Sequence, residues 1–170
     1  MKGAVIYRSK YGSTGQYAKW LSESLQASLI NAKEAGATDL TPFEYLVFCS
    51  PVFYGKLLIS GFIKKNRSLL KDKRIYLLVV GGMDENAKDD IKNMLNANFD
   101  QKFSDYRIKW FYSGGRMKVE KLGFFEKFLV KKLEKMVKDE KEKEKLQNGY
   151  DHIDREKLNA VLEQIREDSK

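Results

Sequence analysis

The sequence contains little cysteine and little histidine. A single cysteine, Cys49, excludes an intramolecular disulfide and any Cys-rich metal cluster. It follows the apolar residues 46–48, where a lone cysteine is usually a packing residue. The single histidine, His152, lies in a polar connection and is interpreted as a surface residue. We therefore assign neither residue a catalytic role, and we expect no bound metal.

Long hydrophobic runs are also absent. No apolar segment approaches the roughly 20 residues that a membrane-spanning helix requires. Residues 1–3 lead directly into a strand-like segment and leave no room for a signal peptide. We expect a cytoplasmic protein, peripheral at most to the inner face of the membrane. Its 170 residues suffice for one domain, 1–170, with a core on both faces of a sheet.

Acidic residues are the minority among the charged ones. The chain has 32 Lys and Arg against 24 Asp and Glu, a formal net charge of +8. This excess predicts an acidic partner. Nucleic acid is not favoured, because the chain has no zinc-finger spacing and no aromatic RNA-binding strand motif, and its basic residues are interleaved with acidic ones. A small diffusing electron carrier that docks on basic partners is expected to be acidic, so the positive net charge also disfavours that class.

Five short segments have the pattern of strands, the first and fourth as buried apolar runs, the second more weakly and the fifth by alternation. They are residues 3–7, 28–32, 45–49, 75–80 and 107–112. Helical apolar spacing is found over residues 14–25, 57–70 and 87–95, and from 122 to the end with a break near 148–150. Because parallel neighbours cannot be joined by tight turns, this alternation predicts an α/β fold: a doubly wound, five-stranded parallel sheet in three layers.

The loop after the first strand has the composition of a phosphate site. It consists of Ser9, Lys10, Tyr11, Gly12, Ser13 and Thr14. Its hydroxyls, its glycine and the amides of the following helix would together bind an anion. The same residues also suit an ordinary helix cap, with Ser13 or Thr14 capping the first turn. The loop lacks the Gly-Lys-Thr ending of a nucleotide P-loop and the third glycine of a dinucleotide fingerprint, so a mononucleotide is favoured over ATP, GTP and NAD.

This loop resembles the phosphate loop of the flavodoxin family, in which Ser or Thr stands at each end and a glycine between. Ser9, Gly12 and Thr14 match that pattern. The segment after the third strand resembles the family's second flavin loop, and Phe53 or Tyr54 would stack on the isoalloxazine ring there, or would only cover the end of the sheet. The segment after the fourth strand takes the place of the third flavin loop but lacks its tyrosine.

The resemblance implies FMN as the cofactor and a strand order of 2-1-3-4-5. The FMN contacts that it implies beyond the phosphate loop come from Pro51, Val52, Phe53, Tyr54, Gly55, Gly81, Gly82 and Met83.

Within this superfamily the chain is most similar to flavodoxin-domain proteins of the menaquinone-dependent protoporphyrinogen oxidase type. The similarity rests on residues 50–55, followed by Lys56 and an apolar helix, and on residues 113–115 leading through a basic linker to 122–128. It implies an FMN-dependent oxidoreductase whose chemistry needs no protein nucleophile. The donor would be protoporphyrinogen or another small hydrophobic molecule, and the acceptor a quinone or another redox protein. A non-enzymatic electron carrier, a flavin-binding interaction module and a fold relative without cofactor remain as alternatives.

Two basic segments bear on the membrane. Residues 55–74 hold seven basic residues against one acid, most simply as the solvated face of a helix. Residues 122–137 place apolar side chains on one helical face and lysines elsewhere. Packing on the protein's own sheet is favoured for this face over contact with an anionic membrane or a partner groove. Residues 138–145 alternate in charge, which predicts a solvated continuation of the same helix, so that a charged helical extension covers about 122–147.

Overall fold

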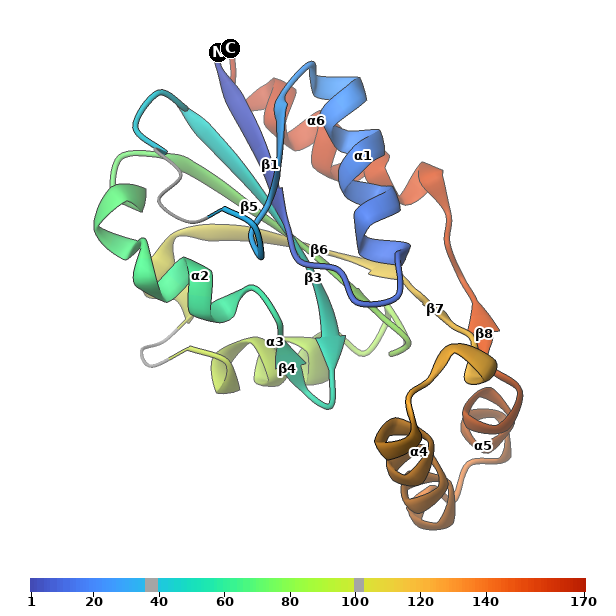
Figure 1. The fold of residues 1–170 in the computed structure, drawn as a ribbon. Coiled ribbons are helices and arrows are strands. Elements are labelled where there is room, and N and C mark those ends of the chain that lie inside the picture. The colour runs from blue at the N-terminus through green and yellow to red at the C-terminus, as the bar shows by residue number, and fades with distance from the viewer. Residues whose placement is uncertain (36–39, 100–102) are drawn as a thin grey trace.

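The computed structural model describes residues 1–35, 40–99 and 103–170, and its centre is a parallel sheet (Figure 1). The five main strands are β1 (Gly3–Tyr7), β2 (Ser28–Asn31), β3 (Tyr45–Phe53), β5 (Arg74–Gly81) and β6 (Ile108–Gly114). They pair in the order β2-β1-β3-β5-β6, and the short β4 (Lys56–Leu57) pairs antiparallel with the end of β3. The predicted α/β class and the order 2-1-3-4-5 of the main strands are confirmed.

Helices cover both faces of this sheet (Figure 1). On one face lie α1 (Ser13–Leu25) and α6 (Asn159–Glu167), and on the other α2 (Ser60–Lys65) and α3 (Lys88–Ala97). Successive residues of β3 alternate between the two layers: Val47 and Cys49 pack with α1 and α6, whereas Leu46 and Phe48 pack with α2 and α3. Because both faces are covered, the central strands are apolar without interruption.

Short 3₁₀ helices complete the connections: η1 (Arg67–Leu70), η2 (Phe103–Tyr106), η3 (Val119–Lys121) and η4 (Arg155–Leu158).

Two predicted boundaries are wrong. The pattern ends the third strand at Ser50 and Pro51, but β3 continues to Phe53. Its pairing with β1 stops at Cys49, its pairing with β5 continues to Pro51, and Val52 and Phe53 pair with β4. The helix predicted over 57–70 is shorter, because Leu57 belongs to β4 and the chain is regular α-helix only in α2 before it tightens into η1.

The chain that follows β6 leaves the sheet. Strand β7 (Arg116–Met117) pairs antiparallel with β8 (Tyr150–Asp151), and between them α4 (Phe124–Met136) and α5 (Glu140–Asn148) form a helical hairpin. We call residues 124–148 the α4–α5 hairpin. It projects beyond the end of the sheet at which β6 terminates (Figure 1).

The predictions for this segment are partly wrong. Helix α4 packs against α5 instead of the sheet, and Val130 is its one buried residue. The charged stretch does not continue α4, because Val137 is extended and the Asp139 side chain starts α5 by accepting from the Glu142 amide at 2.9 Å. The predicted break near 148–150 is confirmed at Gly149, whose φ is 77°.

Among the residues that the structure describes, no helix is both long enough and apolar enough to cross a bilayer.

Candidate functional site

The loop between β1 and α1 leaves the start of the helix open. Gly12 is the N-cap residue with φ of 95°, and a Cβ at this position would meet no atom within 4 Å. Its amide donates to Ser9 Oγ at 3.2 Å, which closes the turn. Among the described residues no side chain caps the first turn of α1, so the predicted cap by Ser13 or Thr14 is wrong. First-turn amides without a side-chain cap are the donors that an anion at a helix N-terminus requires.

An aromatic group lies beside this loop. The rings of Phe53 and Tyr54 meet edge to face with centroids 4.6 Å apart, and the ring of Tyr11 lies 6.3 Å from that of Phe53. The Lys10 ammonium stands 4.0 Å from the centroid of Phe53. Tyr54 and Gly55 both have positive φ, which turns the chain sharply from β3 into β4. The end of β3 and the loop before α1 therefore share one aromatic wall.

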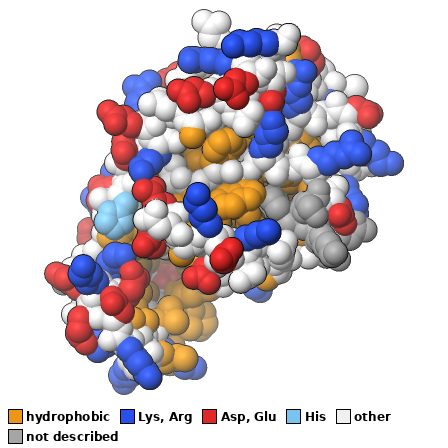
Figure 2. Space-filling model, turned by 180° about the vertical axis from the view of Figure 1, so that it is seen from behind, with side chains coloured by type: hydrophobic (Ala, Val, Ile, Leu, Met, Phe, Trp, Pro, Cys, Tyr) orange, Lys and Arg blue, Asp and Glu red, His pale blue; other side chains and the backbone are white. Residues whose placement is uncertain are grey.

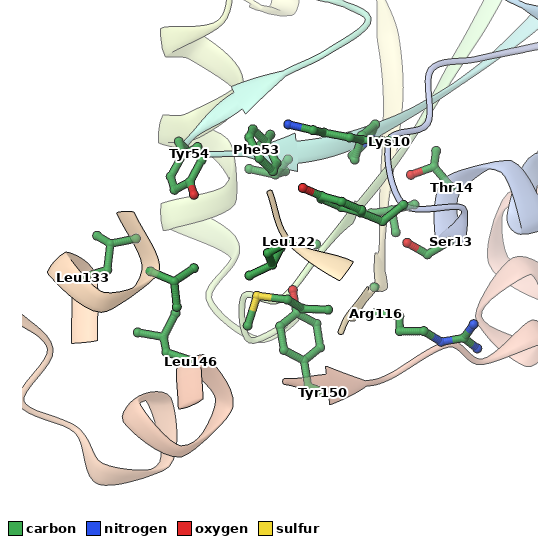
Figure 3. Close-up of a pocket in the computed structure, with 18 residues that line it drawn as sticks. Lys10, Ser13, Thr14, Phe53, Tyr54, Arg116, Leu122, Leu133, Leu146 and Tyr150 are labelled. Atoms are coloured by element: carbon green, nitrogen blue, oxygen red, sulfur yellow. The ribbon is translucent and has the colours of Figure 1, made fainter. Parts of the chain in front are cut away.

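Both loops border one cavity (Figure 3). Nine residues predicted as cofactor contacts line it: Lys10, Tyr11, Ser13, Thr14, Pro51, Val52, Phe53, Tyr54 and Gly81.

The other five predicted contacts are placed differently. Ser9 and Gly12 form the turn before α1 and Gly55 the turn after β3, and none of the three lines the cavity. Gly82 and Met83 lie on another side of the loop after β5, where the Met83 amide donates to the Tyr112 hydroxyl at 2.7 Å. The structure thus brings four residues of each of the first two predicted loops to one cavity, and the third loop only through Gly81. Whether these residues contact FMN stays a prediction.

The cavity also has residues that the sequence did not point to. They are Val80, Gly115, Arg116, Met117, Leu122, Val130, Leu133, Leu146 and Tyr150. Most follow β6 or belong to the α4–α5 hairpin. Gly114 and Gly115 at the end of the fifth strand indicated a further loop at this edge of the sheet. No local sequence pattern predicts that the hairpin covers the cavity.

Tyr150 is one of the lining residues that the sequence did not indicate. Its hydroxyl lies so close to Gly82 that a Cβ on Gly82 would come within 2.4 Å of it. The loop after β5 contains no tyrosine, but Tyr150 of β8 lies against it. Burial raises the pKa of Tyr150, and the nearby Glu142 carboxylate acts in the same direction, so the phenol stays protonated.

One carboxylate ties the hairpin to the phosphate loop. Glu126 of α4 accepts hydrogen bonds from the Lys10 ammonium and the Tyr11 hydroxyl, and from the Gly123 amide at 2.9 Å. The hydrogen bond from Lys10 is the main cause of the lowered pKa of Glu126. Arg116, the other cation of the cavity lining, pairs through Nε with Asp151 Oδ2 at 2.7 Å. Both cations of the cavity lining are thus paired with carboxylates.

The family model for the flavodoxin domain matches residues 4–144. The chain belongs to the flavodoxin family. In the flavodoxin-like arrangement of strands FMN binds where the strand order reverses, at the ends of the first and third strands. The cavity lies at this position, between the end of β1 and the end of β3. FMN is therefore the cofactor of this chain, and the chain is a flavoprotein of the electron-transfer type.

Solved structures that are similar to the chain include two flavodoxins. A Megasphaera elsdenii flavodoxin has 13% identity and a TM-score of 0.48, over 66% of this chain and 83% of that one. The Trp repressor binding protein of Bacillus subtilis has 16% identity and a TM-score of 0.47, over 67% and 84%. A Fusobacterium nucleatum flavodoxin mutant bound to flavin mononucleotide has 14% identity and a TM-score of 0.45, over 72% and 73%. No curated protein matches the chain.

The residues present fit FMN. A phosphate needs hydrogen-bond donors and close backbone approach, and Gly12 leaves open space at the uncapped start of α1. A flavin ring needs apolar or aromatic neighbours, and Phe53 and Tyr54 supply them in the same cavity. In the described part of the chain no group of three or more metal-ligating side chains is found.

Proposed function

We propose that this chain is an FMN-dependent oxidoreductase that oxidises a small hydrophobic donor and passes the electrons to a quinone or to another redox protein. The observation that carries this proposal is the single cavity that joins the uncapped start of α1 to an aromatic loop and to the apolar side of the α4–α5 hairpin. A carrier that meets only protein partners has no need of an apolar chamber next to its cofactor, whereas a small-molecule site is lined in this way.

Each wall of the cavity would have its own task. The hydroxyls of Ser13 and Thr14 and the first-turn amides would bind the phosphate, with the dipole of α1 adding to the attraction. Phe53 or Tyr54 would flank the ring, and Gly81 would let it approach the end of β5. The bound flavin supplies the redox chemistry, by taking up and giving off electrons. The side chains of the hairpin would keep water away from it.

The identity of the donor rests on resemblance. Protoporphyrinogen is one candidate, because the chain is similar to flavodoxin-domain proteins of the menaquinone-dependent protoporphyrinogen oxidase type. The alternative is a non-enzymatic electron carrier or a flavin-binding interaction module. The net charge of +8 weighs against a carrier that docks on basic partners. Turnover with a small hydrophobic donor and a quinone, without any protein partner, would separate the enzyme from the carrier.

We also propose that the protein touches an anionic membrane through α4, since quinones of the menaquinone type reside in the bilayer. Four large apolar side chains of this helix face solvent: Phe124 (94% exposed), Phe125 (69%), Phe128 (61%) and Met136 (70%). Four lysines accompany them on the same helix: Lys127, Lys131, Lys132 and Lys135. In Figure 2 the hairpin, at lower left, carries hydrophobic side chains on its surface with basic ones beside them. Such a helix suits the interface of an anionic bilayer.

The basic residues of 55–74 do not join this surface. Lys64 and Lys65 belong to α2 and Arg67 to η1, beside the sheet, and in Figure 1 α2 and the hairpin lie at different ends of the molecule. We therefore assign the proposed membrane contact to the hairpin alone.

The cofactor assignment is tested by comparing FMN with riboflavin, which lacks the phosphate. We expect the purified protein to be yellow or to bind added FMN tightly in a fluorescence titration, and to bind riboflavin far more weakly. Equal affinity for the two flavins would contradict the assignment of the phosphate to the start of α1.

A further inference from the structure

We propose that the hairpin side of the cavity is a second binding site, which takes a flat, uncharged, apolar ring compound next to the flavin. This inference rests on the proposed function, because it names the place and the chemical class of the proposed small-molecule electron acceptor. Its support is the chemistry of the side chains that the hairpin contributes to the cavity.

Those side chains are all hydrocarbons. Leu122 and Val130 are buried where the hairpin meets the flavin loops, but Leu133 is 38% exposed and Leu146 is half-buried, although both line the cavity. In Figure 3 Leu133 and Leu146 lie on the same side of the pocket as Tyr54, whereas Ser13, Thr14 and Arg116 lie on the other. The cavity is thus divided into a polar side, which suits the phosphate, and an apolar side. An apolar ligand that covers the aliphatic side chains gains the free energy of removing their surface from water.

The charges of the lining point to an uncharged ligand. Lys10 is engaged by Glu126, and Arg116 by Asp151, so both cations already have carboxylate partners. An anionic ligand on the apolar side would bury its charge against leucines or would have to displace one of these carboxylates, and either event costs free energy. A neutral ring meets neither cost.

The shape of the walls favours a flat molecule. The proposed function places the flavin ring on Phe53 and Tyr54, so the second ligand would lie between that ring and the aliphatic side of α4 and α5. Aromatic rings pack well on other flat rings. The Glu126 contacts fix α4 to the phosphate loop, so the aliphatic wall keeps a defined position relative to the flavin site.

The test is a calorimetric titration of menadione, an uncharged naphthoquinone, into the FMN-saturated protein. Saturable binding is expected, and the same ring with a sulfonate group should bind at least about tenfold more weakly, because no unpaired cation receives the charge. Leu133→Gln and Leu146→Gln should each weaken menadione binding by about tenfold through the lost apolar contact. The matched control is Phe124→Gln, the same kind of change on α4 but outside this cavity, and it should leave menadione binding unchanged.

FMN affinity is measured first for every variant and should stay within about twofold of the parent, since the substituted leucines lie on the apolar side. Several outcomes would overturn the inference: no menadione binding to the FMN-saturated protein, loss of menadione binding once FMN is bound, equal binding of the sulfonate, or an equal effect of the Phe124 variant. Binding of FMN without binding of menadione would contradict this inference but not the FMN assignment. Absence of FMN binding would contradict the proposed function itself, whatever the result with menadione.

Discussion

The ammonium of Lys10 donates a hydrogen bond to the carboxylate of Glu126, which lies 116 residues further along the chain. The Tyr11 hydroxyl donates to the same carboxylate, so two neighbouring residues of the phosphate loop hold one residue of α4. Glu126 also accepts from the amide of Gly123 at the start of its own helix. One ionised side chain of α4 therefore joins the α4–α5 hairpin to the loop before α1.

The docking of the hairpin should depend on pH through Glu126. The pKa of this group is lowered in the folded protein from its ordinary value of 4.5, mainly by the hydrogen bond from Lys10. A lowered folded-state pKa means that the stabilisation is complete above the unfolded-state pKa and is lost as the pH falls through the folded-state value. Hydrogen-exchange protection of α4 should hold between pH 7 and the unfolded-state value and decrease below it.

Glu126→Gln should weaken that protection already at pH 7 and remove most of its pH dependence. Glu140→Gln is the matched control: it makes the same change on the hairpin, at a carboxylate that pairs only with Lys143 on the exposed side of α5. Equal protection of α4 in the Glu126 variant and the parent at pH 7 would show that the carboxylate does not hold the hairpin.

Thr14→Ala should weaken FMN binding. Thr14 is 1% exposed and lines the cavity at the start of α1. Removing a hydroxyl that donates to a charged phosphate costs about 1 to 3 kcal/mol of binding free energy, measurable by flavin fluorescence titration. Ser22→Ala is the control, because the Ser22 hydroxyl bonds the Ala27 carbonyl at the far end of α1 and should affect stability but not FMN affinity. Unchanged FMN affinity in the Thr14 variant would contradict the placement of the phosphate beside Thr14.

Gly149→Ala should loosen the hairpin. Gly149 has φ of 77° and ψ of −177°, a region reserved for glycine, and a Cβ there would come within 2.3 Å of the Met117 carbonyl oxygen. We expect a cost of about 1 to 3 kcal/mol, seen as faster exchange of α4 and α5 amides. Gly61→Ala is the control with the opposite expected sign. Gly61 lies within α2 and an added Cβ would meet nothing within 4 Å, so this substitution should raise the free energy of unfolding by about 0.5 to 1 kcal/mol. Two variants of equal stability would refute the strain argument.

The protein should co-sediment with vesicles rich in anionic lipid at low salt. Basic residues near an anionic surface contribute about 1 kcal/mol each, so the lysines of α4 suffice for measurable binding. Raising the salt until the screening length falls below about 8 Å should weaken the attraction, unless the aromatic residues insert. Alanine at Phe124, Phe125 and Phe128 together should reduce binding, whereas glutamine at Lys64 and Lys65 should not. Indifference to anionic vesicles in low salt would favour an electron partner outside the membrane.

The parallel sheet and the loop that we predict to bind the phosphate could both be recognised from the sequence. Both are local features: the apolar runs are contiguous, and Ser9 to Thr14 stand together between the first strand and the first helix. Chirality and the short reach of turns leave few ways to connect the strands. The order itself was predicted from the resemblance to the flavodoxin family. The same hydroxyls suit a helix cap or a ligand site, and only the structure shows that Gly12 is the N-cap residue and that no side chain among the described residues caps the first turn.

The tertiary structure alone decided what covers the cavity. The apolar spacing of residues 122–137 predicts a helix but not its partner, since a helix face packs equally well on a sheet or on another helix. Val137 and Asp139 turn the chain back, and the pairing of Arg116 with Asp151 across β7 and β8 holds the resulting hairpin at the end of the sheet. Neither the approach of Glu126 to Lys10 nor that of Tyr150 to Gly82 has a local sequence signal, because each contact joins residues that only the completed fold brings into range.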